Sequence, residues 1–202
     1  MIKEACIENF TEAFAAQKAG ANRIELCENL QVGGTTPSYG TIKTCVEKLN
    51  IPSFVMIRPR GGNFIYSEEE LEIMKTDIDS CKQLEVPAVV FGLLTKDGLI
   101  DEEKTRELIE RSRPMKVTFH KAFDELSDPF EGLKILIRLG VDRILTSGTK
   151  PTAKEGTAIL NQLIEQANGR ITIIVAGKVT RTNLTELSQT IKSTEFHGKK
   201  IV

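Results

Sequence analysis

Short apolar runs and longer amphipathic segments alternate along the whole chain. Eight runs have the length of a strand, and each of the first seven precedes a stretch with apolar residues at helical spacing. Strands that alternate with helices form parallel sheets, so the pattern predicts an α/β fold. The expected strands are 2–7, 23–27, 53–58, 88–93, 116–120, 143–147, 171–177 and 193–198.

Signals at the ends of the amphipathic segments support seven helices between these strands. Ser67 and Glu70 have the spacing of a capping box, and Asp128 precedes a proline at a helix start. Glycines follow three of the segments as C-terminal stops: Gly20, Gly140 and Gly169. The expected helices are 9–19, 38–49, 68–85, 101–113, 128–139, 153–167 and 181–192.

Eight parallel strands form either a closed barrel or an open, doubly wound sheet. The segment 23–27 lacks the hydrophobic continuity expected at the centre of an open sheet. We therefore predict a TIM-type (β/α)8 barrel, as a single domain over residues 1–202. A short repeat agrees with it, because residues 19–26 resemble residues 139–146, four strand–helix units later.

The last predicted strand has no clear eighth helix after it, because only Lys199-Lys200-Ile201-Val202 follow in this sequence. The outer faces of the first and last strands would then lack a cover. We expect a homodimer or higher homo-oligomer to bury them. A further C-terminal segment, beyond the sequence given, is the alternative cover.

Side chains alternate along a strand, and the polar set therefore marks the face toward the barrel axis. Buried charges need partners, and pairing of Arg58 with a glutamate is the simplest expectation. The alternative is a polar plug that only stabilises the interior. The ionisable residues expected at the axis are Glu4, Glu25, Arg58, His120, Glu195 and His197.

Charge and cysteine content narrow the classes of partner. Lys+Arg number 27 and Asp+Glu 28, and no basic run is interleaved with aromatics, so we expect neither nucleic acid nor membrane as a partner. No secretory signal pattern is present at the start, which favours the cytoplasm. The four cysteines contain no C-x-x-C pair, so free thiols or soft-metal ligands are expected. Packing accounts for Cys45 and Cys81.

Several segments resemble the signature segments of the copper-homeostasis CutC family, in the same order. They are Glu25-Leu26-Cys27, Gly33-Gly34-Thr35-Thr36-Pro37-Ser38, Arg58-Pro59-Arg60-Gly61-Gly62, Thr118-Phe119-His120-Lys121-Ala122-Phe123-Asp124, Thr146-Ser147-Gly148 and His197-Gly198. The resemblance covers nearly the whole chain. It implies a TIM-type barrel, a role in cytoplasmic copper homeostasis, and Cu(I) binding by Cys6 and Cys27.

Two thiolates on one face of neighbouring strands suit one Cu(I) ion, because such strands lie about 4.8 Å apart. A zinc ion would need four ligands, and only His or Glu could complete that set. Cys6 and Cys27 could instead be small, buried apolar residues, as free cysteines often are.

An enzyme that acts on a small phosphorylated or carboxylated metabolite is the second hypothesis. His120 would be the general acid or base, with Asp124 or Glu25 setting its tautomer, unless it is only a buried structural histidine. The ligand-binding candidates are Glu4, Arg58, Arg60, Ser147, Gly177 and His197. The loop 33–38 would close over the mouth, and Ser38 would cap the following helix.

Overall fold

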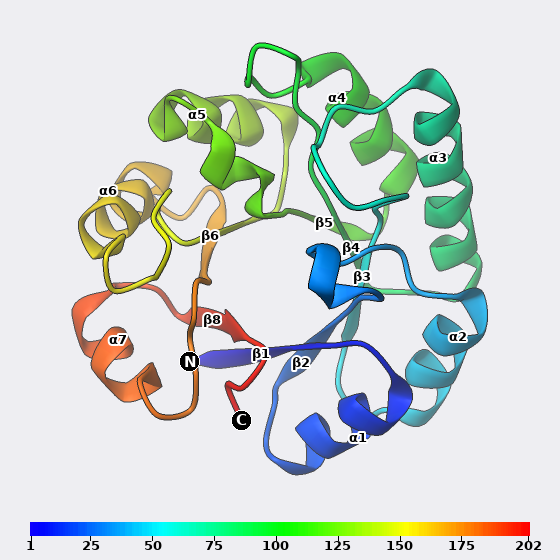
Figure 1. The fold of residues 1–202 in the computed structure, drawn as a ribbon, viewed down its shortest axis with the longest axis horizontal. Helices are drawn as coiled ribbons and strands as arrows, with labels where there is room; N and C mark the ends of the chain where they lie inside the picture. Colours follow the sequence, from blue (N-terminus) through cyan, green and yellow to red (C-terminus); the bar gives the residue numbers. More distant parts are fainter.

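Eight parallel strands close into a barrel with seven helices around it (Figure 1). The computed structural model describes residues 1–202. Neighbouring strands pair in sequence order, and β8 pairs with β1 to complete the ring. The strands are β1 (Ile2–Ile7), β2 (Arg23–Leu26), β3 (Ser53–Met56), β4 (Ala88–Phe91), β5 (Lys116–Phe119), β6 (Arg143–Thr146), β7 (Thr172–Val175) and β8 (Glu195–Gly198). The prediction of a closed barrel is confirmed.

Helices α2, α3 and α5 begin where the capping signals predicted, whereas α6 and α7 begin four and three residues later than expected. They are α1 (Phe10–Lys18), α2 (Tyr39–Lys48), α3 (Glu68–Gln83), α4 (Glu102–Ser112), α5 (Pro129–Leu139), α6 (Thr157–Ala167) and α7 (Leu184–Thr190). Ser67 and Glu70 form the capping box of α3, and Ser38 caps α2. Gly140 ends α5 in the left-handed conformation, whereas the left-handed cap of α6 is Asn168, one residue before the expected Gly169.

Six strands end one or two residues earlier than predicted, because the chain leaves the sheet at the mouth of the barrel. Cys27, Arg58, His120 and Ser147 each follow a strand by one or two residues. The peptide N–H of Cys27 still donates to the Ile7 carbonyl. These residues therefore lie at the C-terminal mouth, where the loops after the strands build the site.

Apolar side chains pack on both faces of the sheet. Aliphatic and aromatic side chains between strands and helices form the outer core of 48 buried residues. A small apolar cluster fills one side of the barrel interior: Cys6, Cys27, Phe54, Met56, Ala88 and Val90. The interior also contains ionisable side chains, as the alternation of side chains along the strands predicted.

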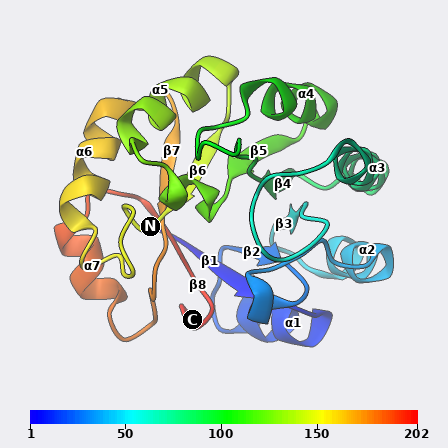
Figure 2. The ribbon, with the colours of Figure 1, turned by 45° about the horizontal axis from the view of Figure 1, so that its top comes forward.

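No eighth helix covers the gap between α7 and α1, where the C-terminus lies (Figures 1 and 2). Ile201 is buried there, but a groove of about 310 Å³ remains between α1 and the C-terminal residues. Ala15, Ala19 and Val202 line this groove together with Lys199 and Lys200. None of the seven helices has the length and apolarity needed to cross a bilayer.

Candidate functional site

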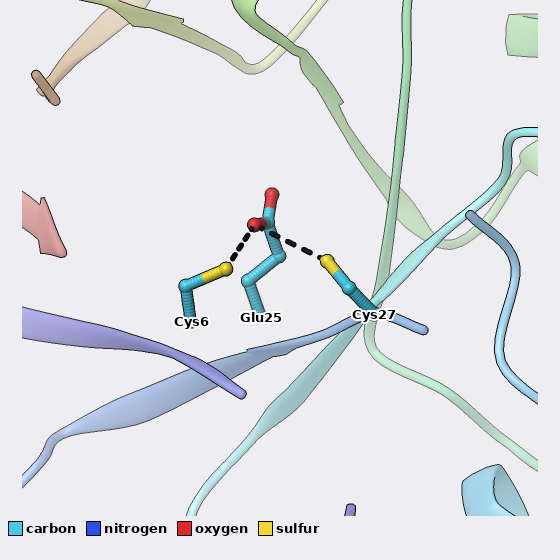
Figure 3. Close-up of side chains that lie close together, drawn as sticks. All are labelled: Cys6, Glu25 and Cys27. Carbon is cyan, nitrogen blue, oxygen red and sulfur yellow. Dashed lines mark hydrogen bonds between the residues drawn. The ribbon is translucent and has the colours of Figure 1, made fainter. Parts of the chain in front are cut away.

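Cys6, Glu25 and Cys27 form a buried cluster at the mouth of the barrel. Cys6 is on β1, Glu25 is on the adjacent β2, and Cys27 follows β2 on the same face. Figure 3 shows the Glu25 carboxylate between the two sulfurs. Its Oε2 lies 3.4 Å from Cys6 Sγ and 3.5 Å from Cys27 Sγ, and both thiols donate to it. The three ligand atoms lie within 4.8 Å of one another.

His197, on β8, extends this cluster across the β1–β8 pairing. Its Nδ1 lies 2.8 Å from Glu4 Oε1, and its Nε2 lies 3.7 Å from Glu25 Oε2. The register places His197 beside Glu4, which explains the short contact. The imidazole therefore has one nitrogen on a carboxylate and the other facing the cysteine cluster.

Arg23 neutralises the carboxylates deeper in the barrel. Its guanidinium donates to Glu4 and to Glu195, and Arg143 Nε lies 3.6 Å from the same Glu195 oxygen. Both guanidiniums stack on Phe54, at 4.7 and 5.1 Å from the ring centroid. The expectation that Arg58 pairs with a glutamate was wrong, because Arg23 reaches these carboxylates from within the barrel and Arg58 lies above them.

Arg58 instead holds the loop after β2. Its guanidinium donates to the carbonyls of Val32 at 3.0 Å, Gly34 at 2.9 Å and Gly62 at 2.6 Å. A Cβ at Gly33 would lie 3.0 Å from Arg58 Nη1, and the φ of Gly33 is +91°, so a glycine is required there. The loop thus closes over the mouth, as predicted.

A cavity of about 120 Å³ lies beneath this loop. It has both apolar and ionisable walls, which come from six strands or the loops after them. Its lining residues are Cys6, Glu25, Leu30, Gly33, Met56, Phe64, His120, Lys121, Leu145 and His197. Four predicted site residues therefore share one cavity. Lys121 had not been predicted, although it follows His120 in the sequence.

His120 is a neutral histidine. Burial and the charge of Arg58 lower its pKa to about 3. The peptide N–H of Ala122 donates to Nδ1 at 3.2 Å, which leaves the proton on Nε2, and Nε2 has no partner. The tautomer is therefore set by the backbone, and the expectation that Asp124 or Glu25 sets it was wrong. A Cβ at Gly92 would lie 2.6 Å from Nδ1, so the ring needs that glycine.

The ionisable groups of the cluster have displaced pKa values. Burial alone would raise the pKa of Glu4, but His197 and Arg23 lower it to about 2. Burial raises the pKa of Glu25 to about 8. The Cys27 thiol lowers the pKa of Cys6 against the effect of burial, and the pKa of Cys27 is raised. Glu4 is thus the more acidic of the two carboxyl groups, and Cys6 is the more acidic of the two thiols.

The charges around His197 favour its protonated form. Burial alone would lower the pKa of His197, but the Glu25 charge and contacts with Cys6 and Glu4 raise it well above the usual value.

The predicted ligand-binding residue Arg60 does not line the cavity. Arg60 pairs with Glu70 and donates to the carbonyls of Gly61, Asn63 and Ile65.

Asp124 connects the loops after β5 and β6. It accepts from Thr146, from the peptide and hydroxyl groups of Ser147, and from Lys121. Burial would raise its pKa, but Lys121 and these hydrogen bonds lower it. Gly177 packs against Ser147, where a Cβ would lie 2.6 Å from the Ser147 Cβ. Asp124, Ser147 and Gly177 thus form a separate, hydrogen-bonded support beside the cavity.

A family model described as the CutC family matches residues 1–202. The chain belongs to the CutC family. The human copper homeostasis protein cutC homolog is 46% identical over 196 residues, which are 97% of this chain and 72% of the relative. A family protein CutC of Histophilus somni is 46% identical over 194 residues, which are 96% of this chain and 80% of the relative.

Solved structures agree with this CutC assignment. A CutC crystal structure from Streptococcus agalactiae superposes with a TM-score of 0.95 at 40% identity, over 100% of both chains. Deoxyribose phosphate aldolase from Aeropyrum pernix superposes with a TM-score of 0.69 at 12% identity, over 98% of this chain and 86% of that chain. The second likeness concerns the barrel fold alone.

Proposed function

We propose that this CutC-family protein binds Cu(I) in the cytoplasm through the thiolates of Cys6 and Cys27. The observation that carries the proposal is the position of both sulfurs on one carboxylate oxygen, Glu25 Oε2, at 3.4 and 3.5 Å. Relatives bearing the name copper homeostasis protein support the choice of metal. Copper is then the cargo of the site.

The chemistry of the cluster suits a soft, monovalent ion. Thiolates select Cu(I), and two sulfurs that lie within 4.8 Å of each other are close to the span of about 4.6 Å given by two metal–sulfur bonds. The Leu30 side chain and the backbone at Gly33 cover the site, which limits the access of water and oxidants. The lowered pKa of Cys6 makes it the first thiol to lose its proton to the ion.

A Cu(I) competition titration under anaerobic conditions tests the proposal. We expect about one Cu(I) per reduced chain, and loss of that ion in the Cys6→Ser, Cys27→Ser double variant. The matched control is Cys45→Ser, Cys81→Ser, which removes two buried thiols from outer helices and should leave copper binding intact. Retention of copper by the first double variant would reject these ligands.

A TIM-barrel enzyme acting on a small anionic metabolite is the second candidate. It is supported by His120, whose protonated Nε2 lines the cavity without a partner, and by Lys121 beside it. A neutral N–H and an ammonium group suit a phosphate or carboxylate oxygen. A thermal-shift screen of phosphorylated and carboxylated metabolites should find a ligand that stabilises the wild type and not His120→Gln. If no anion in the screen stabilises the wild type, this candidate function is rejected.

A further inference from the structure

Four buried side chains with three kinds of donor atom converge at the mouth. Cys6 and Cys27 contribute sulfur, Glu25 contributes Oε2, and His197 contributes Nε2. Cys27 is fully buried, and the other three residues are at most 9% exposed. The thiols and Glu25 form one candidate ligand group, and Glu25 and His197 belong to a second group with Glu4. Glu25 therefore belongs to both groups.

The three donor–donor distances that meet at Glu25 Oε2 fit the edges of a metal-centred tetrahedron. Metal–ligand bonds of about 2.0–2.3 Å give donor–donor edges of about 3.3–3.8 Å in tetrahedral geometry. The three edges that meet at Glu25 Oε2 measure 3.4 Å to Cys6, 3.5 Å to Cys27 and 3.7 Å to His197. All three fall within that interval.

His197 has the carboxylate partner that is typical of a metal-binding histidine. Its Nδ1 lies 2.8 Å from the Glu4 carboxylate, which Arg23 in turn holds from below. A carboxylate on one ring nitrogen fixes the orientation of the imidazole and directs the other nitrogen to the metal. Nε2 faces Glu25 at 3.7 Å, too far for a good hydrogen bond.

One oxygen of the Glu25 carboxyl group has no hydrogen-bond partner within the protein. Its Oε1 is buried without a hydrogen-bond partner, although the residue is only 3% exposed. A polar plug that only stabilised the barrel would be expected to satisfy such an atom. A metal ion bound through Oε2 would compensate the charge of this buried carboxyl group.

We propose that Cys6, Cys27, Glu25 and His197 form a tetrahedral site for a divalent transition-metal ion of the zinc type, with Glu4 orienting His197. The inference builds on the proposed function, because both use the two thiols. It adds two ligands that a two-thiolate Cu(I) site does not need. The pocket then discriminates between ions by coordination number, with two ligands for Cu(I) and four for the divalent ion.

Cobalt(II) is a spectroscopic probe for this site. Anaerobic titration of the reduced protein with Co²⁺ should give the intense visible bands of tetrahedral cobalt and the near-ultraviolet band of thiolate–cobalt charge transfer. Zn²⁺ should then displace the cobalt and abolish both. His197→Gln, whose amide can still donate to Glu4, should weaken Co²⁺ binding at least about tenfold and leave the Cu(I) stoichiometry unchanged. Glu25→Gln should weaken Co²⁺ binding likewise.

The variants separate this inference from the copper proposal. His120→Gln is the matched control, because it removes the other histidine of the same cavity and should retain tetrahedral cobalt. Wild-type protein that binds Cu(I) but gives no tetrahedral cobalt spectrum would overturn the four-ligand site alone, as would a His197→Gln variant with unchanged cobalt binding. Wild-type protein that binds cobalt but not Cu(I) would overturn the copper proposal alone. Circular dichroism of each variant checks that the barrel is folded.

Discussion

Arg23 lies between the carboxylates of Glu4 and Glu195 at the centre of the buried charges. Sequence alternation places it on the same face as Glu25, two residues away, so the rule that predicted Glu25 also predicts Arg23 inside the barrel. The repeat of residues 19–26 and 139–146 aligns Arg23 with Arg143, and both stack on Phe54. These two residues were therefore accessible to sequence reasoning and were missed.

Replacing Arg23 with leucine should destabilise the fold strongly. Two buried carboxylates would lose their guanidinium, and we expect the free energy of unfolding to fall by about 3–5 kcal/mol. Urea denaturation measures it. Arg106→Leu, on the exposed surface of α4, is the control and should change stability by less than about 0.5 kcal/mol. Equal stability of the Arg23 variant and the wild type would contradict the assigned charge balance.

His120 predicts a particular dependence of stability on pH. Its pKa is about 3 in the folded protein against 6.5 for an unperturbed histidine, so the unfolded chain takes up the proton first. The part of the unfolding free energy that depends on a neutral His120 is fully present above pH 6.5 and is lost as the pH falls toward 3.

Unfolding free energies at a series of pH values test this linkage. Between about pH 6 and pH 4, wild-type stability should fall more steeply than that of His120→Gln, by about 1.4 kcal/mol per pH unit. Parallel curves for the two proteins would show that His120 is not held neutral by the fold.

At the scale of elements, the loop after β2 depends on contacts that leave little trace in the sequence. Strand and helix order followed from hydrophobic periodicity, and the starts of α2, α3 and α5 followed from their caps. The partners of Arg58 are backbone carbonyls of Val32, Gly34 and Gly62, and every residue has a carbonyl, so composition could not identify them. The same limit explains the strand ends, because the pattern does not show where the chain leaves the sheet.

Removing the Arg58 guanidinium should loosen this loop. Arg58→Met loses three hydrogen bonds to carbonyls, and we expect the opening free energy of residues 29–35 to fall by about 2 kcal/mol. Hydrogen exchange measured by mass spectrometry should show faster exchange in this segment. Arg60→Met is the control, because Arg60 donates to the carbonyls of Gly61 and Ile65 and not to that loop. Unchanged exchange in Arg58→Met would mean that other contacts hold the loop.

At the scale of the whole molecule, the groove between α1 and the C-terminal residues is the surface that an eighth helix would cover. We propose a homodimer or higher homo-oligomer through this groove, where Ala15 and Ala19 are exposed beside Val202. Multi-angle light scattering should give at least a dimer for the wild type and a smaller species for Ala15→Glu. Arg106→Glu, on α4 across the ring, should leave the mass unchanged (Figure 1). A monomeric wild type would contradict the proposal.

X-ray absorption at the copper edge of the Cu(I)-loaded protein tests the central claim most directly, because it reports which atoms bind the metal. Coordination by the Cys6 and Cys27 thiolates predicts a first shell dominated by sulfur, which disappears in the Cys6→Ser, Cys27→Ser double variant and persists in Cys45→Ser, Cys81→Ser. A first shell of nitrogen and oxygen alone in the wild type, or an unchanged sulfur shell in the first double variant, would contradict it.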